Sequence, residues 1–159
     1  MNRHYSAEDY RQAVRLLRST FDNCSITTDI IVGFPGETQA DLEESLRFAD
    51  EIKFAKIHIF PYSAREGTRA AKMPDQLTKA VKAERVKAME EIEKKNRLAF
   101  WNKMIGTEQT IMPEEEKNGY IQGTTANYCP VRWKGMLSNS PVLIKITAHD
   151  DNGLIGELI

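Results

Sequence analysis

The sequence has few cysteines, no long apolar run and no excess of charge of one sign. Only two of its 159 residues are cysteines, Cys24 and Cys129, and their wide separation is typical neither of a disulfide framework nor of a metal-binding motif. No apolar run approaches the roughly 20 residues of a membrane span, and the polar N-terminal residues predict no secretory signal. These absences predict a cytoplasmic protein with reduced thiols.

The charges nearly balance, with a formal net charge of -1. A composition of 41% hydrophobic and 28% charged residues excludes a disordered chain, and the near-neutral balance predicts no overall attraction to nucleic acid. The distribution is uneven, because residues 76–105 carry eight basic and four acidic side chains while both flanks are net acidic. The length fits one domain or two small ones.

Helix and strand signals alternate in the first half of the chain. Capping boxes at residues 6–9 and 38–41 each predict the start of a helix. The β-branched segment 25–32 and the segment 55–60 read as strands, and the first of them must stop at Gly33-Phe34-Pro35-Gly36. The order helix, strand, helix, strand with short connections predicts a right-handed parallel βαβ unit.

A long helix is expected at about residues 79–104, after the capping residue Thr78 and before Gly106. Its basic side chains have two interpretations: they contact phosphates, or they form a solvated face balanced by glutamates. We favour the solvated face, because charged helix faces are routine. The basic residues expected to face water are Lys79, Lys82, Arg85, Lys87, Lys94 and Lys95.

The last third of the chain changes to short strands separated by turn signals. The expected strands are 108–112, 120–124, 128–132, 142–148 and 154–158. Five short strands in about 50 residues predict a small closed barrel of the nucleic-acid-binding type, because closure removes exposed edges. Aromatic and basic side chains that suit unpaired bases occur together at Tyr120, Tyr128, Arg132, Trp133 and Lys134, although the acidic run 114–116 opposes phosphate binding.

Ligands of α/β sheets bind beyond the carboxyl ends of the strands, which here are residues 33–37 and 60–68. Glycines allow close approach, and the helix after Thr38 offers free amides to an anion; the alternative is a tight turn with no ligand. Tyr62 and Arg65 either clasp a substrate or lie in a solvated loop, and His58 is expected to be a core residue rather than a ligand. No nucleophile–base pair is visible.

Two long motifs and the tail resemble the radical-SAM methylthiotransferases. The motifs are ITTDIIVGFPGET at residues 26–38 and FAKIHIFPYSAREGTRAA at residues 54–71. The tail, with GYIQG at 119–123 and GLIGEL at 153–158, resembles the TRAM domain of these enzymes. The motifs are most similar to the branch that methylthiolates threonylcarbamoyladenosine beside the tRNA anticodon.

The resemblance implies an α+β fold in three segments. Residues 1–75 would be the C-terminal fragment of a radical-SAM (β/α) barrel with parallel strands, and residues 76–105 a long linker helix. Residues 106–159 would form a small five-stranded antiparallel, OB-like TRAM barrel. The free strand edges and half-covered apolar face of a barrel fragment predict either self-association or poor stability of residues 1–75 beside an independently folded tail.

The family binds S-adenosyl-L-methionine and two 4Fe-4S clusters, held in part by a CxxxCxxC loop. The two cysteines here cannot supply these ligands, so we expect the chain alone to be inactive and to bind none of these groups fully. The expected partner is the anticodon arm of tRNA; the alternative is a stand-alone RNA-binding or accessory module, or a purely structural interaction domain.

The resemblance also implies site residues. Those matching the S-adenosyl-L-methionine pocket are Ile31, Gly33, Phe34, Pro35, Gly36, Glu37, Phe60 and Tyr62. Those near the target base or facing the tRNA are Arg65, Tyr120, Tyr128, Arg132 and Lys134. No catalytic side chain and no metal ligand are expected within these residues.

Overall fold

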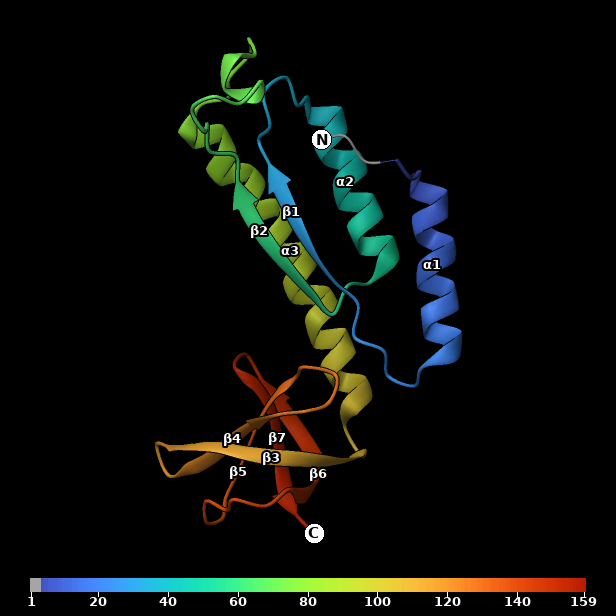
Figure 1. Cartoon of the computed structure of the whole chain (residues 1–159), viewed down its shortest axis with the longest axis vertical. Coiled ribbons are helices and arrows are strands. Elements are labelled where there is room, and N and C mark those ends of the chain that lie inside the picture. Colours follow the sequence, from blue (N-terminus) through green and yellow to red (C-terminus); the bar gives the residue numbers. More distant parts are fainter. Residues whose placement is uncertain (1–3) are drawn as a thin grey trace. The chain divides into compact units, whose positions relative to one another are not determined.

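The computed structural model describes residues 4–159 (Figure 1). The contacts divide the chain into two compact units, one made of the chain up to Val14 with Ile26–Arg97, the other of Arg15–Ser25 with Leu98–Ile159. In the described residues no helix is long and apolar enough to cross a membrane. The elements are α1 (Ala7–Thr20), β1 (Thr27–Val32), α2 (Gln39–Ile52), β2 (Lys56–Pro61), the 3-10 helix η1 (Ala70–Lys72), α3 (Lys79–Met104), β3 (Glu108–Lys117), β4 (Tyr120–Thr124), β5 (Pro130–Trp133), β6 (Val142–Asp150) and β7 (Gly153–Leu158).

The first unit contains the expected parallel pair of strands. β1 and β2 pair in parallel, from Thr27 opposite Lys56 to Val32 opposite Pro61, with α2 between them in the chain. The α2 helix begins where the sequence predicts, because the Thr38 hydroxyl accepts a hydrogen bond from the Asp41 amide while the Asp41 carboxylate accepts one from the Thr38 amide. The predicted α+β class and parallel βαβ unit are confirmed.

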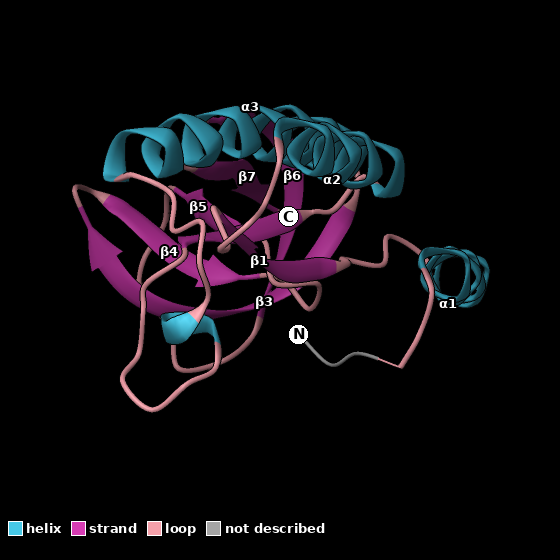
Figure 2. Cartoon of the chain, turned by 90° about the horizontal axis from the view of Figure 1, so that it is seen from above, coloured by secondary structure: helices cyan, strands magenta, loops and turns pink. Residues whose placement is uncertain are grey.

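Among the described residues, helices pack against one face of this sheet and not against the other. The α2 and α3 helices lie on one side of the strands (Figure 2), and the Asn96 side-chain amide of α3 donates to the Ala49 carbonyl of α2 at 3.0 Å. Ile57 is buried on the covered side, whereas Ile31 and Phe60 are exposed on the other. Parallel sheets are usually buried on both faces. Within the described residues, this one has a face that carries apolar side chains and no cover.

The second unit is a closed barrel with the strand order β3-β4-β5-β7-β6. Four of its five pairs are antiparallel, but β5 and β7 run parallel, with Val131 opposite Leu154 and Trp133 opposite Gly156. The expected five-stranded closed barrel is confirmed, and the one departure from antiparallel pairing is the parallel β5–β7 pair. The reason is geometric: strand directions cannot alternate all the way round a closed ring of five, so one pair must be parallel.

The barrel encloses an apolar core that includes the end of α3. Trp101 and Met104 of α3 are buried there with strand residues from every part of the ring. A Cβ added at Gly156 would lie 2.3 Å from Ile144 Cγ2, which shows how closely two strands approach. The remaining core residues are Ile111, Ile121, Cys129, Val131, Trp133, Ile144, Ile146 and Leu154.

Candidate functional site

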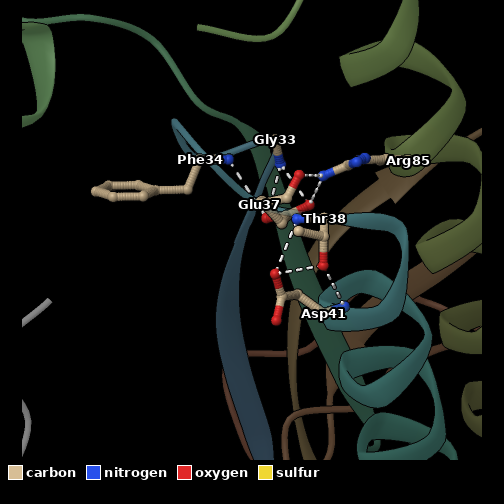
Figure 3. A network of polar contacts seen from close by, with 6 residues as sticks. All are labelled: Gly33, Phe34, Glu37, Thr38, Asp41 and Arg85. Carbon is tan, nitrogen blue, oxygen red and sulfur yellow. Dashed lines mark hydrogen bonds and ion pairs between the residues drawn. The ribbon is translucent and has the colours of Figure 1, made fainter. Parts of the chain in front are cut away.

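The turn after β1 is organised by the carboxylate of Glu37. Its oxygens accept hydrogen bonds from the Gly33 amide at 3.0 and 3.1 Å and from the Phe34 amide at 3.3 Å. Arg85 of α3 forms an ion pair with the same carboxylate and donates to the Glu37 carbonyl at 3.0 Å (Figure 3). Both charged side chains are largely buried, with 8% of Arg85 and 15% of Glu37 exposed. One buried ion pair thus holds the turn to the long helix.

Two basic residues of α3 contradict the expected solvated face. Arg85 is buried against Glu37, and Lys82 is half-buried, with its ammonium donating to the Tyr62 carbonyl at 2.9 Å. The ammonium also lies 5.0 Å from the centre of the Tyr62 ring. The expectation failed for these two side chains because the charge pattern of a helix does not tell which turns of it meet a loop from elsewhere in the chain.

Most amides of the turn that leads into α2 are bonded within the chain. The Gly33 and Phe34 amides bond to Glu37, the Thr38 amide bonds to Asp41, and the Gly36 amide donates to the Asp75 carbonyl at 3.1 Å. These donors are already satisfied within the chain. Within the first turn of α2 the Asp41 amide is bonded as well, to the Thr38 hydroxyl at 3.2 Å, and the anion site expected at this helix start stays a prediction.

Two aromatic rings meet beside this turn. Phe34 and Tyr62 pack edge to face with their ring centres 5.2 Å apart, and Figure 3 shows Phe34 pointing away from the polar network. Tyr62 is buried, and its hydroxyl has no hydrogen-bond partner among residues 4–159. A buried hydroxyl without a hydrogen-bond partner is costly.

The other pocket residues implied by the resemblance occupy varied positions. Gly33 and Pro35 are buried in the turn, while Gly36 is exposed beside them. Ile31 and Phe60 are both exposed on the uncovered face of the sheet and are partners in the strand register. The structure thus brings these residues together at the carboxyl end of one small sheet.

His58 and Arg65, which neighbour these residues in the sequence, are both exposed. His58 is exposed and occupies the strand position opposite Asp29, so the expectation of a core histidine was wrong. Arg65 is exposed in the loop after β2, where its carbonyl accepts hydrogen bonds from Thr68. The alternation of buried Ile57 and exposed His58 along β2 explains the error, because the histidine lies on the uncovered face.

One candidate nucleic-acid surface lies on the outside of the barrel, around Tyr120. The Arg132 guanidinium lies 5.6 Å from the centre of the Tyr120 ring and the Lys134 ammonium 5.7 Å from it. Asp150 holds Arg132 through two hydrogen bonds of 3.0 and 2.6 Å, and the guanidinium keeps the pKa of that carboxyl well below its usual range. Lys117 faces Tyr120 in the strand register. An aromatic ring is thus set among cations.

The β4–β5 loop presents Tyr128 to solvent. This side chain is 85% exposed, and its backbone has a left-handed φ of 62°, which is unfavourable for a bulky residue. The loop is held by buried Thr125, whose carbonyl accepts from the Tyr128 amide at 2.9 Å and whose hydroxyl accepts from the Cys129 amide at 2.9 Å. Asn127 fixes the loop further by donating to the Asn23 carbonyl at 2.9 Å. Tyr128 is thus displayed by a rigidly bonded loop.

The described residues do not fit an iron–sulfur cluster. No group of three or more histidine, cysteine, aspartate or glutamate side chains among residues 4–159 is arranged to hold a metal ion. Cys129 is buried in the barrel core, where burial raises the pKa of its thiol, and Cys24 is half-buried.

The fold defines a two-unit α+β protein with a glycine-containing turn at the carboxyl end of its parallel sheet and a closed barrel that displays aromatic and basic groups. No model of a known protein family matches the sequence. Among curated proteins, the chain is similar to the enzyme named tRNA-2-methylthio-N(6)-dimethylallyladenosine synthase from several bacteria.

The similarity extends over the whole chain. The Pelobacter propionicus synthase is 34% identical over 163 residues, covering 100% of this chain and 37% of the synthase. The Aquifex aeolicus synthase is 35% identical over 161 residues, with the same coverage of both proteins. The Pelotomaculum thermopropionicum synthase is 40% identical over 126 residues, covering 77% of this chain and 28% of that protein. The chain is homologous to part of these synthases and spans less than two fifths of their length.

Proposed function

We propose that this chain is the C-terminal part of a tRNA methylthiotransferase. In it, the carboxyl end of the β1–β2 sheet forms one wall of an S-adenosyl-L-methionine pocket, and the barrel is a TRAM domain that positions tRNA. The proposal rests on the similarity of the whole chain to synthases whose name specifies a tRNA adenosine product. S-adenosyl-L-methionine, when bound to a complete enzyme of this class, would supply the radical chemistry.

The substrate that we propose is threonylcarbamoyladenosine beside the anticodon, on the strength of the phrase at residues 54–71. The relatives reported above are named for dimethylallyladenosine instead. Both substrates are modified adenosines of tRNA, so the same barrel surface would serve either. Mass spectrometry of the nucleosides made by the complete enzyme would separate the two, and only the threonylcarbamoyl product supports this choice.

The uncovered face of the first unit supports a role as a pocket wall. Ile31 and Phe60 offer exposed apolar side chains, and in the neighbouring turn the half-buried Phe34 packs edge to face on the buried Tyr62. Gly33, Pro35 and Gly36 shape the turn, and Glu37 acts from within it by holding its amides. With one wall and no cluster ligands, the chain alone is expected to be inactive, and a methylthiolated nucleoside formed by the reconstituted chain would contradict this.

Tyr128 is the observation that carries the RNA-binding proposal. A left-handed conformation destabilises a bulky residue unless the surrounding structure fixes it. Here the hydrogen bonds of the loop hold the Tyr128 backbone in this conformation, in which the ring is exposed. An exposed aromatic ring of this kind can stack on an unpaired base. Tyr120, Arg132 and Lys134 would contact phosphates farther along the RNA, since Tyr120 and Lys134 lie at the other end of the β4–β5 hairpin from Tyr128. Arg65 would lie close to the target base.

Titration of unmodified tRNA with the chain at several salt concentrations tests this proposal. We expect salt-dependent affinity that Tyr128→Ala weakens about tenfold to hundredfold through the lost stacking. Lys134→Ala should weaken binding less and lower the salt slope by about one. The matched controls are Met136→Ala, which removes another exposed side chain, and Lys145→Ala, which removes a cation from β6.

Two results would contradict the tRNA proposal: no affinity of the unmodified chain, or equal loss in Tyr128→Ala and Met136→Ala. The alternative function is a stand-alone RNA-binding module that acts without S-adenosyl-L-methionine. The same variants would weaken RNA binding in that case, but the complete locus would then encode no CxxxCxxC loop upstream in frame. The sequence that precedes this chain in its gene therefore discriminates the two.

A further inference from the structure

The donors around Glu37 form a concavity that suits an anion. Two backbone amides, those of Gly33 and Phe34, and the Arg85 guanidinium all point at one carboxylate (Figure 3). Consecutive amides beside a cation are the arrangement with which proteins bind external phosphates and carboxylates. Here the anion comes from the same turn, four residues after Gly33, so the site is filled from within the chain.

Burial makes this pair difficult to open. Arg85 is 8% exposed and Glu37 15%, and breaking a buried ion pair by removing one partner leaves an uncompensated charge. Arg85 also donates to the Glu37 carbonyl, so it holds both the side chain and the backbone of the residue. Glu37 and Arg85 are 48 positions apart in the sequence, so their ion pair ties the turn to α3.

The surrounding contacts leave the turn little freedom. Lys82 lies against Gly33 so closely that a Cβ there would be 2.6 Å from Lys82 Cγ, and the same lysine donates to the Tyr62 carbonyl. The Gly36 amide donates to Asp75, and the Tyr62 amide donates to the Val32 carbonyl at 2.8 Å. The turn after β1 and the loop after β2 are thus both held by Lys82 of α3 and by backbone hydrogen bonds.

We propose that Arg85 is a positioning residue, which acts with Glu37 to fix the turn at residues 33–37 before any ligand arrives. The carboxylate of Glu37 is a built-in anion: it occupies the concavity, aligns Gly33 and Phe34, and withholds their amides from the phosphates or carboxylates of a ligand. The proposal rests on the proposed function only in treating this turn as ligand-facing. With the concavity filled, a ligand at this edge must be held by groups other than these two amides.

Amide hydrogen exchange, measured by NMR on the isotopically labelled full chain, tests this inference. In Glu37→Ala, the Gly33 and Phe34 amides should exchange about tenfold to hundredfold faster, because each loses a hydrogen bond to a charged group. Added formate should slow them again by filling the vacated concavity, whereas chloride at the same ionic strength should not. Formate should fail to rescue the double variant Glu37→Ala with Arg85→Met, since the guanidinium is then missing.

Further variants separate positioning from general stability. Glu37→Gln keeps the shape of the side chain and removes its charge. In this variant the Gly33 and Phe34 amides should exchange faster than in the unmodified chain, and formate should not slow them. This variant replaces Glu37→Ala in the test if Glu37→Ala does not fold. Glu44→Ala removes an exposed carboxylate of α2 and should leave Gly33 and Phe34 unchanged. A purely structural role would instead accelerate the Ile57 amide of β2 equally and show no formate effect.

The inference is overturned if Gly33 and Phe34 exchange in the Glu37 variants as they do in the unmodified chain, or if formate does not slow them in Glu37→Ala. These outcomes are independent of the tRNA titration. Loss of the exchange pattern with intact tRNA binding would overturn this inference alone, and absence of tRNA binding with the formate response would overturn the proposed RNA contact alone.

Discussion

At the scale of single residues, one glycine of the barrel leaves no room for a side chain. A Cβ at Gly156 would lie 2.3 Å from Ile144 Cγ2 and 2.9 Å from the Lys145 carbonyl oxygen. Ile144 is fully buried and β-branched, so its side chain has few other conformations. Closely packed interiors do not absorb an added methyl group without strain. Gly156 is therefore required by space rather than by backbone conformation.

The substitution Gly156→Ala should lower the free energy of unfolding of the barrel by about 1–3 kcal/mol. Urea unfolding followed by tryptophan fluorescence measures this, because Trp101 and Trp133 lie in the barrel core. The matched control is Gly135→Ala, whose Cβ would meet the nearest atom of Trp133 at an ordinary 3.5 Å. That variant should change the free energy by no more than about 0.5 kcal/mol. Equal losses in the two variants would show that the close approach at Gly156 is unimportant.

Some site residues could be found from the sequence and others could not. The turn at residues 33–37 is visible, because glycines and proline interrupt a β-branched strand. Its partner Arg85 is not, since nothing local distinguishes a buried arginine from a solvated one in a charged helix. The pairing of Glu37 with Arg85 depends on how α3 returns past the sheet, and this is a property of the fold.

At the scale of elements, local signals predicted the helices best. The capping boxes at residues 6–9 and 38–41 are both formed, and the predicted bounds 79–104 are those of α3. The strand predicted at 108–112 instead continues to Lys117 as β3. Residues 114–117 are exposed, so their sequence lacks the alternation of a half-buried strand, and the pairing comes from β4. Strand pairing is a non-local property that the local pattern could not supply.

The ion pair of Arg132 and Asp150 joins two elements of the barrel. Arg132 lies on β5, and Asp150 ends β6, where it also accepts a hydrogen bond from the Asn152 amide at 2.9 Å. Arg132 keeps the pKa of Asp150 below its value in the unfolded chain, which is about 3.9. Such a lowered pKa stabilises the folded state above the unfolded pKa, and the contribution is lost as the pH falls through the folded value.

Asp150→Asn should therefore be less stable than the unmodified chain at pH 7, and the difference should shrink as the pH falls below about 4. Urea unfolding at pH 7 and at several values below 4 measures the difference. Both partners are partly exposed, so we expect an effect of modest size that salt reduces. Glu157→Gln, which changes an exposed carboxylate of β7, is the control. A difference that grew at low pH would contradict the assignment.

At the scale of the whole molecule, the two units differ in whether their sheets have free strand edges. The barrel strands each have two neighbours, so the ring has no free edge. β1 and β2 pair only with each other among the described residues, so each has a free edge. Free strand edges beside exposed apolar side chains favour pairing with another chain. The relatives are more than twice as long as this chain, which is consistent with the cover of this sheet lying outside the present sequence.

We therefore expect the isolated chain to self-associate through the sheet of its first unit. Light scattering across a dilution series should give an average mass that rises with concentration. The double variant Ile31→Lys with Phe60→Lys should lower that mass, because it places charges on the uncovered face, whereas Leu16→Lys, at an exposed apolar position of α1, should not. A monomer at every concentration would show that the free edges are protected, and an equal effect of Leu16→Lys would place the contact elsewhere. A concentration dependence abolished only by the sheet variants would identify this uncovered face as the surface through which the chains associate.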